Sequence, residues 1–150
     1  MSCPPDASPA SVLFQRVLNS LERQGLMRHL GARLLRVESG LCEIALPYSD
    51  RVTQQQGSFH GGALGALADI AGGYAGLTVA PEGMEVVSVE YKINFLAARQ
   101  GGELRAVGRV VRAGQRVIVT TAEVVHRADD GRETACAVMQ QTLATVAMQY

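Results

Sequence analysis

The chain has 150 residues, 47% of them hydrophobic, and its acidic and basic side chains balance to a formal net charge of zero. This length and apolar content predict one globular domain with a core of its own and argue against a second domain. The sequence has neither a net positive charge nor a run of Lys and Arg, which argues against nucleic acid or an anionic membrane surface as a partner.

The cysteines and the N-terminal residues indicate a cytoplasmic protein. Cys3, Cys42 and Cys136 are odd in number and lack C-x-x-C spacing, which predicts free thiols in a reducing compartment. Residues 1–10 are rich in Pro and have neither a basic region nor a sustained apolar region, so we expect no secretory signal there. We expect this segment to be flexible.

The first predicted elements are a helix and a hairpin. In residues 11–29, apolar side chains recur from Val12 to Leu21 with the period of a helix, which predicts an amphipathic N-terminal helix. Residues 32–38 (ARLLRVE) and 41–48 (LCEIALPY) are strand-like runs separated by Ser-Gly, which predicts two strands of a hairpin. A polar loop follows them.

Residues 57–76, GSFHGGALGALADIAGGYAG, combine small apolar residues with a single charge, Asp69. A membrane span does not fit, because Gly and Ala are weak hydrophobes and a mid-span Asp costs about 2.5 to 3.5 kcal/mol. We therefore predict a buried helix. On a helical wheel, Asp69 lies in a stripe of glycines that are spaced three or four residues apart: Gly62, Gly65, Gly73 and Gly76. Because each Gly within a helix costs about 1 kcal/mol relative to Ala, the stripe predicts close approach of backbone, partner or ligand.

Strands account for the remaining sequence. In residues 86–96 (VVSVEYKINFL) the side chains alternate, which predicts a long half-buried strand with Val87, Tyr91 and Phe95 on one face and Ser88 on the other. Residues 102–114, 115–128 and 132–148 predict three more strands joined by short Gly-containing turns.

The order of these elements predicts an α+β fold. Long antiparallel strands twist strongly, and a helix without a polar face suits the concave side of such a sheet. We therefore expect one long curved antiparallel sheet wrapped around a central helix, with an extra helix at the N-terminus.

Residues 54–75, QQQGSFHGGALGALADIAGGYA, resemble the signature of hotdog-fold acyl-CoA thioesterases of the PaaI-like, phenylacetate-pathway type. In that family an Asn or Gln precedes G-x-x-H-G-G and an Asp or Glu follows on the helix. Here Gln54 stands six residues before His60, and Asp69 stands nine residues after it. Residues 86–98 also resemble the family's next strand, with Ser88 where a polar residue often lines the site. The resemblance covers residues 30–147.

The resemblance implies the hotdog fold and hydrolysis of an aryl- or medium-chain acyl-CoA to the free acid and coenzyme A. It implies a homodimer or a dimer of dimers with sites at the subunit interface. No cofactor is expected, since coenzyme A is part of the substrate. No metal site is expected either, because the histidines share no ligand spacing with one another or with the cysteines.

The catalytic candidates take roles that fit their chemistry. Asp69 would act as general base toward water or as a nucleophile that forms an anhydride. Gln54 would orient the thioester carbonyl or a water, and Ser88 would hold the attacking water. The N–H groups of Gly61 and Gly62 open the helix, so they are expected to be unpaired donors for the developing oxyanion.

Each candidate also has a structural interpretation. His60 either caps the helix or orients the substrate, and Asp69 can be a carboxylate bonded to neighbouring backbone. Gln54 can be a solvated loop residue, and Ser88 can be only the polar face of a strand.

Three further residues are candidates for substrate binding. Gly73 would belong to the surface that the substrate approaches. Arg112 and Arg116 flank the turn where hotdog thioesterases often contact coenzyme A, although solvated strand-end charges are the simpler interpretation of either arginine. A hotdog dehydratase or hydratase, and an acyl-CoA sensor without catalysis, remain as alternatives.

Helix geometry places the complete site across two chains. Gly62 and Asp69 are seven residues apart, so they lie on nearly one face but about 10 Å apart along the axis at 1.5 Å per residue. One carbonyl cannot contact both. We therefore expect Gln54, His60 and Gly62 of one chain to work with Asp69 of the other.

Overall fold

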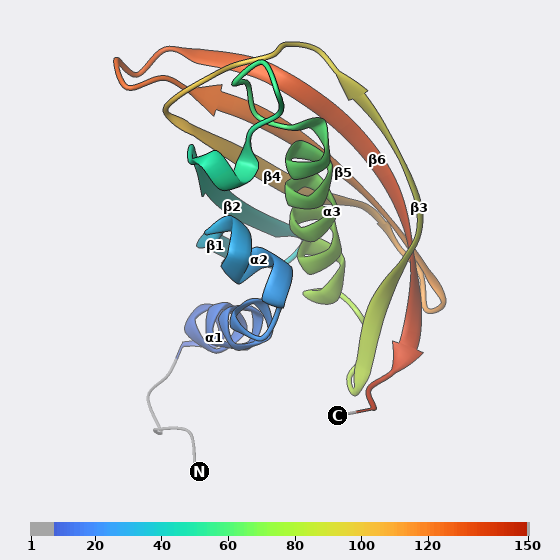
Figure 1. Cartoon of the computed structure of the whole chain (residues 1–150). Coiled ribbons are helices and arrows are strands. Elements are labelled where there is room, and N and C mark those ends of the chain that lie inside the picture. Colours follow the sequence, from blue (N-terminus) through green and yellow to red (C-terminus); the bar gives the residue numbers. More distant parts are fainter. Residues whose placement is uncertain (1–7, 150) are drawn as a thin grey trace.

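The computed structural model describes residues 8–149, and Figure 1 shows one long helix held inside a curved sheet. In chain order, the elements are α1 (Pro9–Glu22), α2 (Gly25–Leu30), β1 (Arg33–Glu38), β2 (Leu41–Pro47), the 3-10 turn η1 (Asp50–Val52), α3 (Gly61–Leu77), β3 (Met84–Phe95), β4 (Glu103–Ala113), β5 (Val117–Arg127) and β6 (Glu133–Ala147).

The strands form one six-stranded antiparallel sheet in the order β1-β2-β4-β5-β6-β3. Its long strands curve around α3, while α1 and α2 lie beside the open side of the helix (Figure 1). This arrangement confirms the predicted α+β fold with a central helix and an N-terminal helical segment.

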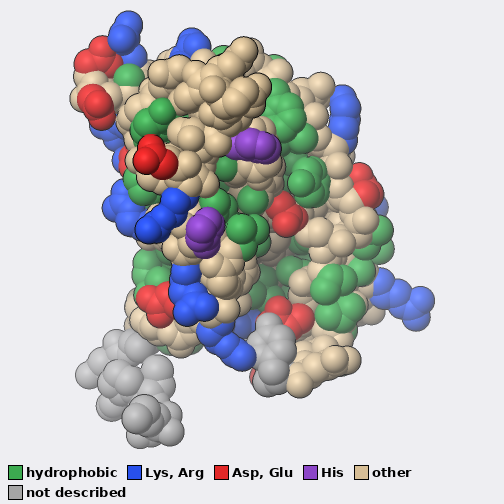
Figure 2. Space-filling model, in the orientation of Figure 1, with side chains coloured by type: hydrophobic (Ala, Val, Ile, Leu, Met, Phe, Trp, Pro, Cys, Tyr) green, Lys and Arg blue, Asp and Glu red, His purple; other side chains and the backbone are tan. Residues whose placement is uncertain are grey.

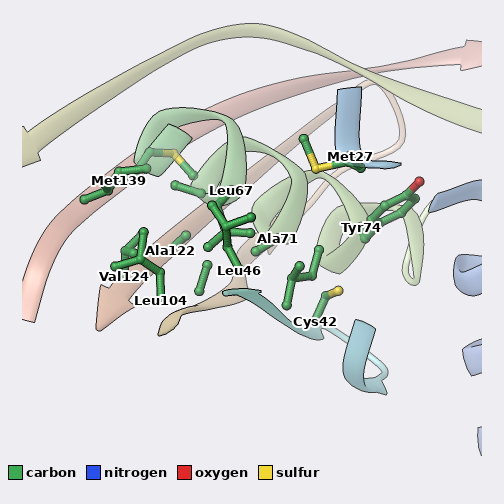
Figure 3. Packing of buried hydrophobic residues seen from close by; sticks show 14 of the residues in the cluster. Met27, Cys42, Leu46, Leu67, Ala71, Tyr74, Leu104, Ala122, Val124 and Met139 are labelled. Carbon is green, nitrogen blue, oxygen red and sulfur yellow. The ribbon is translucent and has the colours of Figure 1, made fainter. Parts of the chain in front are cut away.

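The core lies between α3 and the concave face of the sheet. Leu67 and Ala71 of α3 are buried together with Leu46 of β2, Leu104 of β4 and Val124 of β5 (Figure 3). Fully burying a leucine side chain contributes about 1.5 to 3 kcal/mol, so this layer is a major source of stability. The small residues of α3 allow the helix to sit deep in the sheet.

Two glycines show how closely the helix and the sheet approach. A Cβ atom at Gly108 of β4 would collide with the backbone carbonyl of Ala71 in α3, and a Cβ at Gly76 would collide with the Leu143 side chain of β6. Part of the predicted glycine stripe is therefore explained by contact between α3 and the sheet of the same chain.

The N-terminal helix differs from the prediction at both ends. α1 begins at Pro9, inside the segment expected to be flexible, because the Ser8 side chain caps it by accepting a hydrogen bond from Ser11 N–H at 3.2 Å. The predicted single helix is also wrong, since Gln24 has an extended backbone and α2 starts after it. Residues 1–7 lie outside the described residues, so their predicted flexibility stays a prediction.

A bulge in β3 corrects the predicted faces of that strand. The register against β6 shifts between Ser88 and Glu90. Before the shift, Ser88 faces α3 and donates a hydrogen bond to Asp69; after it, the Tyr91 hydroxyl faces α3 and lies beside Gly65. The prediction that Ser88 and Tyr91 lie on opposite faces is wrong, because a bulge inserts one residue into the alternation.

β3 is also more exposed than a half-buried strand. It forms one edge of the sheet, and its Val87, Val89 and Phe95 side chains are 47%, 62% and 55% exposed. An edge strand with exposed apolar side chains and unpaired backbone groups is suited to pairing with another chain.

Candidate active site

A pocket of about 600 Å³ opens between α1, α3 and the beginning of β3. Asp69, Gly73 and Ser88 contribute to its wall. The apolar part of the lining consists of Ile70, Tyr74, Leu77, Val86, Leu143 and Met148. The one charge of α3 therefore faces a pocket that combines apolar and polar side chains, as small-molecule sites do.

Asp69 is held by hydrogen bonds from two strands. The Ser88 hydroxyl of β3 donates to Asp69 Oδ1 at 2.6 Å, and the Gln141 side-chain amide of β6 donates to the same oxygen. No described residue donates to the other carboxylate oxygen, Oδ2. Asp69 therefore has one fixed oxygen and one oxygen available for chemistry.

One face of α1 forms the polar wall of the pocket. Arg16, Asn19, Ser20 and Arg23 line it at the helical spacing i, i+3, i+4 and i+7. Figure 2 shows basic side chains gathered over α1 and α2, next to a face where hydrophobic side chains are exposed. The pocket lining therefore combines the carboxylates of Asp69 and Glu85, apolar side chains and the basic Arg16 and Arg23.

The Tyr74 hydroxyl joins α1 to α3 within this wall. It donates to Ser20 Oγ at 3.0 Å and accepts from Gln24 Nε2 at 2.8 Å. Burial raises the pKa of Tyr74, although these hydrogen bonds oppose the rise. Gln24 lies at the break between α1 and α2, so its hydrogen bond attaches this break to α3.

His60 is the cap of α3. Its Nδ1 accepts a hydrogen bond from Gly62 N–H at 2.7 Å. The expectation that both glycine amides are open donors is therefore wrong for Gly62. No described residue accepts a hydrogen bond from Gly61 N–H, so this amide remains an open donor at the positive end of the helix.

Gln54 is held within its own loop. Its side-chain oxygen accepts from Gln56 N–H, and its backbone carbonyl accepts from Gly57 N–H at 3.0 Å. The Tyr48 hydroxyl donates to the Gly57 carbonyl at 2.6 Å and fixes the loop. Neither Gln54 nor His60 lines the pocket that contains Asp69.

One protomer therefore carries two separate groups of candidates. Asp69, Ser88 and Gly73 lie together at the pocket, whereas Gln54, His60, Gly61 and Gly62 lie at or before the N-terminal end of α3. Arg112 and Arg116 are exposed around the β4–β5 turn and do not line the pocket.

Sequence reasoning missed Gln141 and Thr120. Gln141 lies between Met139 and Leu143 on the inward side of β6, where each of these residues is buried. Thr120 occupies the corresponding inward side of β5. A polar residue at an otherwise apolar, inward position of a strand is the signal that could have identified them.

Cys42 and Cys136 do not line this pocket. Cys42 and Cys136 are free and buried, and Cys3 lies outside the described part of the chain. Burial raises the pKa of the Cys42 thiol to about 12 and also raises that of Cys136.

Within residues 8–149, no group of three or more His, Cys, Asp or Glu side chains is arranged to hold a metal ion. None of the helices in this part of the chain is long and apolar enough to cross a membrane.

An antiparallel sheet wrapped around one buried helix places the chain in the hotdog-fold class. The sequence profile of the Thioesterase superfamily matches residues 56–134, and the chain belongs to this superfamily.

Individual proteins show the same relationship. The chain is 33% identical over 99 residues to the proofreading thioesterase EntH of Klebsiella pneumoniae, an overlap of 66% of this chain and 72% of that protein. A thioesterase family protein from Silicibacter pomeroyi has a similar crystal structure, with a TM-score of 0.86, 35% identity and coverage of 91% of this chain and 99% of that one.

The Escherichia coli PaaI protein of the phenylacetic acid degradation operon shares the fold. Its TM-score is 0.81 at 22% identity, over 93% of this chain and 97% of that one. The resemblance to hotdog thioesterases is thereby confirmed, and superfamily membership supports hydrolysis of a thioester as the activity.

Proposed function

We propose that the chain hydrolyses acyl-CoA thioesters to a free acid and coenzyme A, with an aryl or medium-chain acyl group in the pocket beside Asp69. One observation carries the proposal: Asp69 and Ser88 are hydrogen-bonded to each other at the wall of a pocket that also has an apolar lining. The chain's membership of the Thioesterase superfamily supports the thioester as the reacting group.

In the proposed reaction, Asp69 is the general base. Because Ser88 donates its proton to Oδ1, an attacking water can donate one proton to the open Oδ2 and the other to a lone pair of Ser88 Oγ. The water oxygen then adds to the thioester carbon as Asp69 takes its proton. When the carbon–sulfur bond breaks, Asp69 returns the proton to the leaving thiolate. Direct attack by Oδ2, which would form an anhydride, is the competing route.

The developing oxyanion would bind at the N-terminal end of an α3 helix. The Gly61 amide is an open donor there, and the helix dipole favours negative charge at this end. The Gly62 amide can join it once the His60 ring releases that N–H group. His60 would thus control the second donor, and Gln54 would orient the carbonyl.

The acyl group would lie along α3. Asp69, Gly73 and Leu77 follow one another along the pocket wall, and Leu77 lies about 12 Å from Asp69 along the axis at 1.5 Å per residue. A ring or a medium-length chain suits this length. The basic and amide side chains of α1 would then meet the distal end of the acyl group.

The proposed assembly is a homodimer, or a pair of such dimers. Within one helix, Gly61 and Asp69 are separated by about 12 Å, by the same rise per residue, so one thioester carbonyl cannot reach both. Pairing through the exposed edge strand β3 would bring a second copy beside Asp69. We propose that Gln54, His60, Gly61 and Gly62 of one protomer complete the site around Asp69 of its partner.

Arg112 and Arg116 are proposed contacts for the coenzyme A phosphates. Both side chains are exposed, and neither has a hydrogen bond or ion pair with a described side chain. Two guanidinium groups near one turn suit phosphate recognition.

The test is a panel of acyl-CoA thioesters that differ in acyl length and aromaticity, with release of free thiol as the signal. We expect thiol release to be fastest with aryl or medium-chain acyl groups. Change in enoyl absorbance without thiol release would instead indicate a hydratase. Binding without either signal would indicate a sensor, and both outcomes would overturn the proposal.

A further inference from the structure

We infer that Gln141 is a positioning residue that holds the Asp69 carboxylate in its reactive orientation, and that Thr120 holds the Gln141 amide in place by donating a hydrogen bond to its oxygen. This inference rests on the proposed function. It assigns a catalytic contribution to two strand residues that face α3 from β5 and β6.

Gln141 and Thr120 are both completely buried, with 0% of each exposed. A buried amide left without partners is destabilising, so the hydrogen bonds of Gln141 determine where its side chain lies. Its Nε2 donates to Asp69 Oδ1 and, at 2.9 Å, to Ser88 Oγ; its Oε1 accepts from the Thr120 hydroxyl at 3.0 Å.

The chemistry of the partners fixes which end of the amide faces Asp69. An ionised carboxylate only accepts hydrogen bonds, so it requires the NH₂ end of Gln141. The opposite end must then be the oxygen, and the Thr120 hydroxyl supplies the donor that it needs. If the amide turned over, its oxygen would face the Asp69 carboxylate, and two acceptors would then oppose each other. Asp69 therefore selects the direction of the amide, and the Thr120 hydroxyl holds the amide there by donating to Oε1.

The two oxygens of the Asp69 carboxylate therefore have different surroundings. Gln141 and Ser88 both donate to Oδ1, which leaves Oδ2 as the oxygen that can accept the proton of the attacking water. Gln141 also donates to Ser88 Oγ, so the Ser88 proton is directed at Asp69 rather than at the water. Loss of Gln141 would free Asp69 to rotate, and would thus reduce the fraction of molecules with a correctly placed base.

Gly72 of α3 provides the space for this arrangement. A Cβ atom there would collide with Gln141 Oε1 and would lie 2.8 Å from the Thr120 hydroxyl oxygen. This glycine, three residues after Asp69, therefore admits a buried polar pair next to the helix. Gly72 of α3, Thr120 of β5 and Gln141 of β6 thus pack together beside Asp69.

The experiment compares Thr120→Val with Thr120→Ser, because the first removes the hydroxyl at nearly constant volume and the second retains it. We expect Thr120→Val and Gln141→Met to lower kcat by about 10-fold or more with KM within about twofold, as for a group that acts on the chemical step. Thr120→Ser should retain kcat close to that of the wild type.

A double-variant cycle tests whether Gln141 acts through Asp69. In an Asp69→Asn background, Gln141→Met should cause little further loss, since residues that act as one unit are not additive. A full additional loss would overturn the inference. So would a Thr120→Val variant with unchanged kcat.

Crystal structures of wild type, Thr120→Val and Gln141→Met separate this inference from the proposed reaction. If the wild type releases no thiol from any acyl-CoA, the proposed function fails, but the structures still decide the positioning role. We expect the Asp69 carboxylate to leave Ser88 or to become disordered in both variants. A carboxylate that keeps its wild-type position in both would overturn the inference, whatever the activity.

Discussion

The Ser88 hydroxyl donates to Asp69 Oδ1 at 2.6 Å, although the two residues belong to different elements and are 19 positions apart in the chain. A bulge follows Ser88, and without it an unbroken alternation would place Ser88 and Tyr91 on opposite faces of β3. The bulge therefore allows one strand to supply both a polar contact to Asp69 and an aromatic residue that faces α3.

Asp69→Asn should abolish most turnover. The amide keeps the volume of the carboxylate and can accept hydrogen bonds, but it cannot take a proton from water. We expect kcat to fall by about 100-fold or more, with a thermal unfolding midpoint near that of the wild type. The measurements are steady-state thiol release and calorimetry. A variant with near-normal kcat would remove Asp69 from the reaction.

Isotope labelling should reveal an anhydride on Asp69 if water opens it at the Asp69 carbon. If Asp69 activates water directly, a single turnover in ¹⁸O-labelled water places the label in the product acid. An anhydride opened by water at the Asp69 carbon would instead place the first label in the enzyme carboxylate. We expect label in the product after one turnover and none in peptides that contain Asp69. Mass spectrometry of both fractions measures the result.

Gly73→Val should impair binding of the acyl group without damaging the fold. Space is open around Gly73, since nothing lies within 4 Å of a Cβ placed there, and the residue lines the pocket. A branched side chain would therefore fill the acyl site, and we expect KM for aryl or medium-chain substrates to rise by about 10-fold. Gly73→Ala is the matched control, with a smaller effect. Unchanged kinetics and oligomer size in Gly73→Val would show that the acyl group lies elsewhere.

Mixed dimers should recover activity if the site spans two protomers. Gln54→Ala and Asp69→Asn are each expected to be inactive, and random pairing after reversible dissociation makes about half of the dimers mixed. Each mixed dimer has one intact site of two, so activity should return to about a quarter of wild type when sites act independently. A mixture that stays inactive, while mass spectrometry shows mixed dimers, would place the whole site within one chain.

The buried thiol of Cys42 should make stability decrease at alkaline pH. Burial, with a smaller effect of Glu43, raises its pKa to about 12 from an ordinary value of 9.0. Above pH 9 the unfolded chain loses this proton while the folded chain keeps it. The free energy of unfolding should then fall by about 1.4 kcal/mol per pH unit for this group alone.

Urea unfolding between pH 9 and pH 11 checks this expectation. Cys42→Ala removes the titrating group, so its free energy of unfolding should fall less steeply than that of the wild type, even though the smaller side chain lowers its stability overall. Tyr74 adds a similar slope to both proteins, because burial is the largest cause of its raised pKa and Cys42 is a minor one. Parallel slopes would contradict the expectation.

The sequence predicted the fold because its strongest patterns are local. The small apolar residues of α3 and the alternation of the long strands are readable along the chain, and both correspond to observed elements. The break at Gln24 is not readable in this way, because it is stabilised by a hydrogen bond to Tyr74, a residue 50 positions away. Contacts of this kind depend on the finished fold.

The candidate site was predictable only in part for the same reason. Asp69 was found as the single charge on an apolar helix, and it lies at a pocket. Gln141 was missed, because adjacent glutamines at positions 140 and 141 conceal which one points inward until the register with β5 is known. Likewise, the presence of His60 in a sequence motif cannot show that its ring accepts a hydrogen bond from Gly62 N–H.

The wall that α1 contributes to the pocket lies outside the part of the chain by which the superfamily is recognised. Arg16, Asn19 and Ser20 face the pocket, whereas the superfamily profile matches residues 56–134. Under the proposed function, selection can therefore alter acyl preference through one face of an N-terminal helix while Asp69 and its hydrogen-bond partners remain unchanged. Two descendants of such an enzyme would then look alike across the shared region and yet differ in the metabolites that they consume.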